Sequence, residues 1–204
     1  MSSESFGDPS TRQRILEAAW KLVEERDDVR LVDVAERAGV SRQAVYLHFG
    51  DRAGLLTALV LFMDEALGVE GMAVRVFEAP DGVEMLERVV DLNAVLAPRI
   101  DRVAQVLESG QHRDAALRAA WRNRLDNRRS IHRSIVQRIA DEGRLAEGWT
   151  VDAASDLFHA VMLPGTWREL TKEVGWTADQ YRAYVTRLLR RSLIADPPST
   201  LRRS

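Results

Sequence analysis

The chain has no cysteine among its 204 residues, and only 2 lysines accompany its 27 arginines. The absence of cysteine excludes a disulfide scaffold and any metal site built on thiolates. No apolar run approaches the roughly 20 residues that a membrane-spanning helix needs. The opening stretch, MSSESFGDPS, lacks the apolar segment of a secretion signal. We therefore expect a cytoplasmic protein that is not associated with a membrane.

The signatures of common enzyme sites are also missing. Glycines are scattered rather than gathered in a phosphate-binding loop, and neither H-E-x-x-H nor G-x-S-x-G occurs. His112 and His132 would lie about 30 Å apart if one helix carried both, which is too far to share a metal ion. We expect both to be ordinary, partly exposed side chains. The sequence predicts no catalytic residue, no metal site and no cofactor.

Helical periodicity dominates what is present. Hydrophobic residues make up 46% of the chain and charged residues 29%, a balance typical of folded globular proteins. Apolar residues recur at helical spacing, and no segment alternates as a β-strand would, so we predict an all-α fold. The expected helices cover approximately residues 10–26, 31–38, 41–49, 51–67, 83–96, 98–110, 113–142, 150–174 with a break at Pro164, and 178–195. Residues 68–82 are expected to be less regular.

The most informative stretch runs from Leu31 to Leu56, LVDVAERAGVSRQAVYLHFGDRAGLL. Gly39 can adopt the positive φ that ends a helix, and the Ser41 hydroxyl can cap the next one. Val45 then packs inward, while the opposite face of the second helix stays open. Two short helices joined by a tight turn form a helix-turn-helix. The open face carries hydrogen-bond donors and amphipathic rings, which suit the major groove of DNA.

This stretch resembles the DNA-binding signature of TetR-type transcriptional regulators. The resemblance rests on the Ala-Gly-Val-Ser turn at 38–41, on Tyr46, on Phe49 after His48, and on Arg52 at the start of the next helix. It implies an N-terminal three-helix DNA-binding head at 1–53 and a C-terminal helical domain for ligand binding and dimerisation at 54–196. Residues 197–204 are expected to be a flexible tail. The implied function is a homodimeric repressor, released from a near-palindromic operator in double-stranded DNA by a small-molecule effector of unknown class.

The predicted DNA contacts lie on the second helix of the motif and just after it. They are Ser41, Arg42, Gln43, Ala44, Tyr46, Leu47, His48 and Arg52. Arg42 and Gln43 are the candidates for base edges, since arginine suits guanine and glutamine suits adenine. We assign Tyr46, His48 and Arg52 mainly to phosphates, although Arg52 could instead be a solvated residue at a helix start. Residues 1–55 hold 8 Lys or Arg against 10 Asp or Glu, so specificity should depend on a few groove contacts and on pairing two heads.

Large adaptable side chains and a few charged ones are the candidates for an effector pocket. They are Phe62, Met63, Met85, Trp121, Arg124, Arg128, Phe158, His159, Met162 and Trp167. The apolar members could equally be ordinary core. Arg124 and Arg128 fall in the same angular sector as the buried stripe of the long helix. They either pair with Asp126 or with acids on neighbouring helices, or face a cavity that accepts an anionic or polar effector.

The resemblance also implies that the last two helices pair with their copies in a second subunit. The candidate interface residues are Leu157, Val161, Tyr181, Tyr184 and Leu188. Such a dimer would present two recognition helices about 34 Å apart. The alternative is a TetR-like co-regulator that binds a protein and has lost operator recognition. It is favoured by the acidic head and by the short link at 27–30, which lacks the glycine usual in the family. An enzyme is the third candidate.

Overall fold

The computed structural model describes residues 9–26 and 29–195. The predicted tail at 197–204 lies outside this part of the chain, as do Asp27 and Asp28 of the link after the first helix. In the described residues no β-strand occurs, and extended backbone pairs only in an isolated antiparallel bridge between Leu145 and Ile194. The all-α prediction is confirmed.

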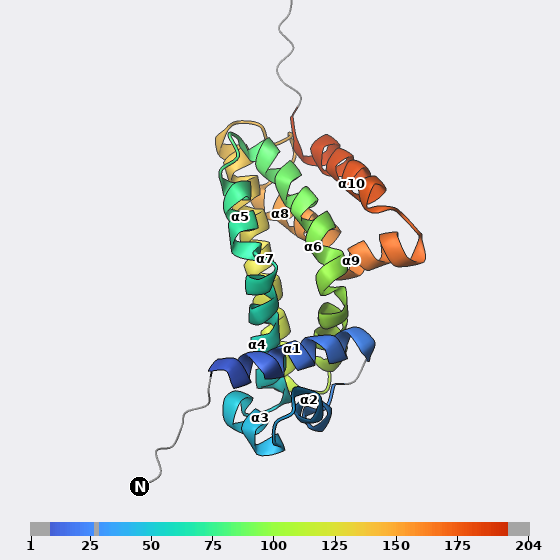
Figure 1. The fold of residues 1–204 in the computed structure, drawn as a ribbon. Coiled ribbons are helices and arrows are strands. Elements are labelled where there is room, and N and C mark those ends of the chain that lie inside the picture. Colours follow the sequence, from blue (N-terminus) through green and yellow to red (C-terminus); the bar gives the residue numbers. More distant parts are fainter. Residues whose placement is uncertain (1–8, 27–28, 196–204) are drawn as a thin grey trace, which may run out of the picture. The chain divides into compact units, whose positions relative to one another are not determined.

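Figure 1 shows the order of the helices along the chain. They are α1 (Pro9–Glu25), α2 (Leu31–Ala38), α3 (Arg42–Phe49), α4 (Arg52–Ala66), α5 (Val69–Phe77), α6 (Gly82–Gly110), α7 (Ala115–Asp141), α8 (Val151–Val161), α9 (Pro164–Arg168), the π-helical turn η1 (Glu169–Glu173) and α10 (Ala178–Leu193).

The chain divides into two compact units. Unit 1 comprises Met1–Val69 and Ile100–Arg124, and unit 2 comprises Glu70–Arg99 and Leu125–Ser204. Helices α6 and α7 therefore each contribute one segment to each unit. This division follows packing, whereas the boundary expected after residue 53 follows the sequence motif. Helix α4 accordingly belongs to the same unit as α1, α2 and α3.

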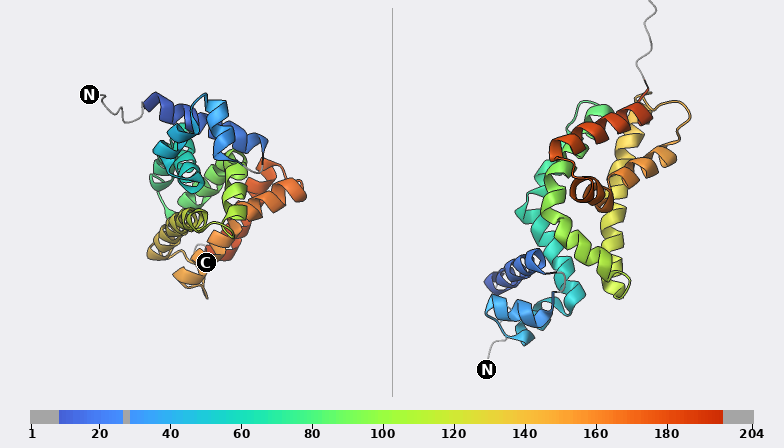
Figure 2. Two further views of the ribbon diagram at one scale, coloured as in Figure 1. Left: turned by 90° about the horizontal axis from the view of Figure 1, so that it is seen from below. Right: turned by 90° about the vertical axis from the view of Figure 1, so that its right-hand side faces the viewer.

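Unit 1 is organised around a small helical head. Helix α1 packs on α2 and α4, and α2 packs on α3; Figure 2 shows these helices from two further directions. Ile15, Ala19 and Leu22 recur at helical spacing along the buried side of α1. Val34 of α2 and Val45 of α3 are fully buried against the same core. One inward-facing valine in each helix of the motif therefore leaves the rest of the short helix α3 available to face outward.

Local capping explains where the helices of the head begin and end. Gly39 follows α2 at φ 65°, and the Val40 N–H donates to the Ala35 carbonyl at 3.0 Å. Ser41 Oγ accepts from the Ala44 N–H at 3.1 Å, and Asp51 Oδ1 accepts from the Gly54 N–H at 2.7 Å. These bonds satisfy helix-end groups that would otherwise lack partners. The Gly39 turn and the Ser41 cap predicted from the sequence are confirmed.

Helices α5 and α6 of unit 2 differ from the prediction. Residues 69–77, expected to be irregular, form α5. Pro98, expected to begin a new helix, lies inside the continuous helix α6. A proline inside a helix removes one N–H donor and crowds the carbonyl four residues earlier. Here buried contacts on both sides of Pro98, including Val90, Ala94 and Val103, hold the helix together despite that cost.

The later helices agree with the sequence. Helix α7 is continuous, α8 ends shortly before Pro164, and α9 begins there. Thr177 and Gln180 form a reciprocal capping box at the start of α10. The core of unit 2 gathers buried side chains of α5 to α10, among them Leu86, Ile135, Phe158 and Leu189.

Candidate DNA-binding surface and effector site

Helix α3 presents most of the predicted DNA contacts to solvent. Arg42 and Gln43 are exposed, Tyr46 is 47% exposed and Leu47 is 80% exposed. Ala44 and His48 are half-buried. The exposure of Leu47 is notable because a large apolar side chain gains nothing from water, whereas in a major groove it can contact a thymine methyl group. The geometry therefore agrees with a recognition surface on this helix.

Ser41 has a structural role as well as its predicted DNA contact. Its oxygen accepts the first-turn N–H of α3, which fixes where the helix starts. A hydroxyl keeps its own hydrogen for a second partner, so capping and phosphate binding are compatible.

Arg52 is tied to the head itself. Its Nε donates to the Val29 carbonyl at 2.9 Å, across 23 positions of sequence. This bond joins the first turn of α4 to the residues just before α2. Arg52 is thus half-buried and held by a backbone bond, and the predicted phosphate contact would have to share the guanidinium with this bond.

The acidic side chains of the head are partly neutralised within it. Arg30 binds Asp33 at 3.0 Å, and Arg37 binds Glu25 at 2.7 Å. The hydrogen bond from Arg30 lowers the pKa of Asp33, and that from Arg37 lowers the pKa of Glu25. These pairs are exposed, so each stabilises the fold little, but together they remove negative charge from the surface around α2.

The predicted effector residues do not form one group, because they divide between the two units. Phe62, Met63, Trp121 and Arg124 belong to unit 1. Phe62 stacks edge-on against Trp20, and Met63 is buried. Arg124 Nη2 donates to Asp64 Oδ1 at 2.7 Å. Of the two predicted alternatives, Arg124 thus takes the ion pair with an acid on a neighbouring helix.

Arg128 begins a chain of hydrogen bonds inside unit 2. Its Nη2 donates to Asn93 Oδ1 at 2.8 Å and to the Met162 carbonyl at 2.9 Å. The Asn93 amide then donates to the Tyr181 hydroxyl at 2.8 Å, and that hydroxyl points at Met162 Sδ, 3.8 Å away. We call these four residues, Arg128, Asn93, Tyr181 and Met162, the polar chain. It links α6, α7, α10 and the residue that ends α8 within one core.

His132 and His159 form a second buried contact close to the polar chain. Their Nδ1 atoms are 3.3 Å apart, and the His132 ring stacks on Phe158 with 4.6 Å between ring centroids. Burial lowers the pKa of His132 to about 3, with help from the positive charge of Arg128. Burial also lowers the pKa of His159. Both rings are therefore neutral near pH 7, and one Nδ1–H donates to the other Nδ1.

Two sequence-based assignments in unit 2 are corrected. His132 is only 3% exposed, not partly exposed as expected. Tyr181, predicted at a subunit interface, is fully buried at 0% exposure and belongs to the core. Its hydroxyl is used by Asn93, and burial raises its pKa. By contrast, Tyr184 and Leu188 are 44% and 50% exposed, while Leu157 and Val161 are half-buried against the core.

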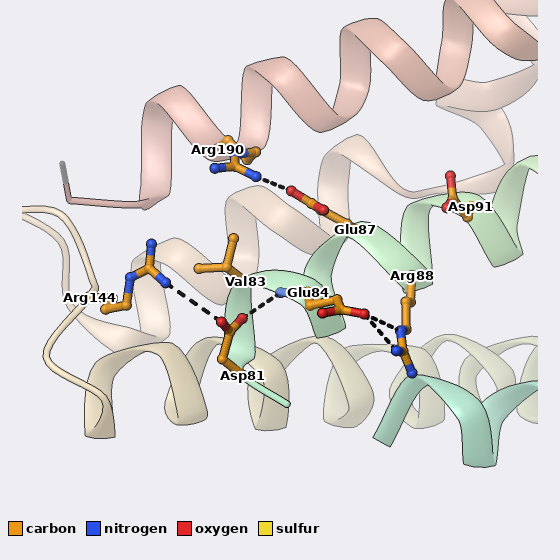
Figure 3. A pocket seen from close by; sticks show the side chains of 8 residues that line it. All are labelled: Asp81, Val83, Glu84, Glu87, Arg88, Asp91, Arg144 and Arg190. Carbon is orange, nitrogen blue, oxygen red and sulfur yellow. Dashed lines mark hydrogen bonds and ion pairs between the residues drawn. The ribbon is translucent and has the colours of Figure 1, made fainter. Parts of the chain in front are cut away.

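Two surface grooves lie on unit 2, and neither includes a predicted effector residue. The groove of about 520 Å³ in Figure 3 is lined by Asp81, Val83, Glu84, Glu87, Arg88, Asp91, Arg144 and Arg190. Its arginines bind its own acids, in the pairs Arg88–Glu84, Arg144–Asp81 and Arg190–Glu87. A second groove of about 570 Å³ is lined by Met72, Arg75, Val76, Glu78, Arg88, Asp91, Leu92 and Val95.

Over residues 9–26 and 29–195, no three histidine or acidic side chains are grouped so that they could hold a metal ion. In the same residues no single helix has the length and apolarity to cross a bilayer. Within these residues, α3 and α4 would be long and apolar enough only if they were counted as one helix. The two helices are bent by 70° at their junction.

The fold and the exposed helix α3 define a class. An all-helical chain whose head presents the second helix of a helix-turn-helix to solvent has the architecture of a helix-turn-helix DNA-binding protein. Residues 15–59 match the sequence pattern of the family described as "Bacterial regulatory proteins, tetR family". The matched stretch contains the helix-turn-helix, so this part of the chain is similar to the DNA-binding segment of that family.

Individual proteins are also similar to this chain in sequence or in fold. The regulator TtgR of Pseudomonas putida is 38% identical over 78 residues, and the match covers 37% of this chain and 36% of TtgR. The chain thus spans about a third of the length of this curated relative. A proposed transcriptional regulator of Saccharomonospora viridis, crystallised with choline, has a TM-score of 0.77 at 19% identity, covering 93% of this chain and 100% of the other. FadR of Bacillus subtilis, crystallised with stearoyl-CoA, has a TM-score of 0.71 at 20% identity, covering 88% and 98%.

The sequence did not single out Asn93, and although it named His159 as an effector candidate it did not pair this residue with His132. Their partners lie 88 and 27 positions away along the chain, so no local pattern connects them. Helical spacing was the one signal in the sequence that could have indicated a buried His132. His132 stands three residues before Ile135, on the stripe predicted to be buried, and a polar residue there calls for a partner.

Proposed function

We propose that this protein is a homodimeric repressor that binds a near-palindromic operator and leaves it when a small-molecule effector binds. The observation that supports this best is the surface of α3. The helix is fixed at its start by the Ser41 cap and anchored by the buried Val45, and it exposes donors and an apolar tip. A rigid helix with such a face fits a major groove.

Base recognition is assigned to Arg42 and Gln43, and phosphate binding to Tyr46, His48 and Arg52. The test measures the affinity of Gln43→Ala for operator DNA and for unrelated duplex. Losing a side chain that reads a base should weaken operator binding by about 1–3 kcal/mol and leave non-specific binding unchanged. An equal loss on both duplexes would contradict the assignment.

Dimerisation is assigned to the outer surfaces of α8 and α10. Tyr184 and Leu188 are the strongest candidates, because large apolar groups that are half-exposed in one chain are typical of surfaces covered by a partner. Leu157 and Val161 would contribute their remaining exposed parts. Sedimentation of Leu188→Glu should show a monomer at concentrations where the wild type is a dimer. Val174→Glu is the matched control, because the Val174 side chain is 57% exposed but lies outside both helices.

The effector is proposed to bind in unit 2, at the polar chain. A guanidinium held by an amide oxygen and a backbone carbonyl can exchange one of these neutral acceptors for an anionic or strongly polar group of a ligand. Choline and stearoyl-CoA in the related structures are different molecules, so they do not indicate this chain's effector. By linkage, DNA must weaken effector binding by the same factor by which the effector weakens DNA binding.

Two experiments test the regulator as a whole. A gel-shift with the DNA upstream of its own gene asks whether the protein binds an operator there. Absence of binding to any upstream segment would favour a protein-binding co-regulator, which the net charge of −2 over residues 1–55 also fits. For the effector, a compound that releases the wild type from DNA should fail to release Arg128→Met. Unchanged release would remove Arg128 from the site.

A further inference from the structure

Most positive charges of the head are used inside the head. Residues 1–55 contain 8 Lys or Arg. Five of them bind backbone carbonyls or acids of unit 1, namely Arg14, Arg26, Arg30, Arg37 and Arg52. Arg12, Lys21 and Arg42 form no hydrogen bond or ion pair with the residues at 9–26 and 29–195. An acidic head that binds DNA must rely on the few cations that its own acids do not occupy.

Arg12 lies beside the end of α3. It is an exposed residue in the first turns of α1, and its guanidinium carbon lies 5.5 Å from the centroid of the Phe49 ring. Phe49 is the last residue of α3. Figure 1 shows the N-terminal end of α1 next to α3. Arg12 thus places a positive charge at one end of the recognition helix, and Arg42 places another at its start.

The Phe49 ring gives this charge a defined position. The ring is half-buried and lies against His48, with 5.9 Å between ring centroids. An arginine attracted to an aromatic face is restricted in its rotamers while its N–H groups remain available. A charge held in this way costs less entropy to fix on a phosphate than a freely moving side chain does.

We propose that Arg12 binds the DNA backbone as a phosphate contact at the Phe49 end of α3, and that Phe49 positions it. This inference rests on the proposed DNA-binding function and adds a residue outside the helix-turn-helix motif. Arg12 carries no sequence specificity in this role, because phosphates are the same at every base pair.

The test is the salt dependence of DNA binding by the full-length protein. The probes are a labelled duplex from upstream of the gene and a duplex of unrelated sequence, followed by fluorescence anisotropy. Each phosphate contact contributes about 0.9 to the slope of log affinity against log salt, so a dimer of Arg12→Ala should lose roughly two units of slope. Its defect relative to wild type should then shrink about tenfold between about 50 and 200 mM salt.

The conservative variant separates charge from structure. Arg12→Lys keeps the positive charge and should restore the slope. Lys21→Ala is the matched control, because it removes one charge from the same helix. Lys21 lies on the opposite face of α1 from Arg12, because nine helical positions end half a turn away. Its charge helps to lower the pKa of Glu25. We expect Lys21→Ala to leave the slope unchanged.

The role of the Phe49 ring in positioning Arg12 is tested with Phe49→Leu. This variant keeps Arg12 but removes the aromatic face, so affinity should fall about two- to fivefold per head at constant slope. Thermal unfolding of each variant, measured in parallel, identifies any loss that comes from a destabilised head.

The outcomes separate the two proposals. If the wild type binds neither duplex, the DNA-binding function fails and the role of Arg12 with it. If the wild type binds and Arg12→Ala keeps the wild-type slope, or changes it no more than Lys21→Ala does, only the role of Arg12 is overturned. A reduced slope that Arg12→Lys restores supports the phosphate contact.

Discussion

Replacing Tyr181 by phenylalanine tests the polar chain with a change of one oxygen atom. The Asn93 amide would lose its acceptor, the Tyr181 hydroxyl at 2.8 Å, in a site where both side chains are buried. Leaving a buried neutral donor without a partner costs about 1–3 kcal/mol, and the phenylalanine ring keeps the packing. We therefore expect the free energy of unfolding to fall by about 1–2 kcal/mol.

Urea denaturation followed by circular dichroism measures this change. Protein concentration must be held constant, because dimerisation would add to the apparent stability. Tyr184→Phe is the matched control: it removes the same atom from an exposed side chain of the same helix and should stay within about 0.5 kcal/mol of wild type. A double-mutant cycle with Asn93→Ala isolates the interaction between the two side chains.

Equal stabilities for Tyr181→Phe and Tyr184→Phe would refute the reasoning, because the hydroxyl would then contribute nothing as a buried acceptor. A change in the dimer dissociation constant without a change in protomer stability would also refute it, and would return Tyr181 to the interface that the sequence predicted.

Three other changes have defined outcomes. His132 has its pKa lowered to about 3 by burial, so the unfolded chain takes up a proton below about pH 6.5 and the folded chain does not; stability should fall between pH 6.5 and 3 by about 1.4 kcal/mol per pH unit, and urea titrations of His132→Gln should show a shallower fall. Gly54→Ala would place a Cβ 2.0 Å from the Phe49 carbonyl oxygen, so the junction of α3 and α4 must shift, and we expect weaker DNA binding in anisotropy titrations together with a lower thermal midpoint. Thr177→Ala removes the side-chain cap of α10 and should lower the urea-derived stability by about 1 kcal/mol; an unchanged midpoint would show that packing alone defines this helix end.

Features specified by neighbouring residues could be predicted from the sequence. The turn at Gly39 and the caps at Ser41, Asp51 and Thr177 depend on bonds that span three to five positions, so the residues that make them stand together in the chain. The exposed face of α3 follows from the same local information, because a short helix with one buried valine must expose its other sides.

Features that depend on packing could not be predicted in the same way. Proline propensity favours a helix break at Pro98, but contacts along both sides of α6 outweigh it. On α10 the buried residues Tyr181, Val185 and Leu189 and the exposed pair Tyr184 and Leu188 form one broad apolar stripe in the sequence. Periodicity reveals such a stripe, but it does not tell which part meets the protein's own core and which part meets a partner.

The polar chain has a consequence for engineering this protein as a sensor. Arg128, Asn93 and Tyr181 are the residues proposed to recognise the effector, and they also hold three helices and the end of α8 together in one core. Any substitution that retunes ligand preference at these positions will also change the fraction of folded protein. Libraries aimed at new effectors should therefore start from a stabilised parent and vary the neighbouring apolar positions first, so that loss of response can be told apart from loss of fold.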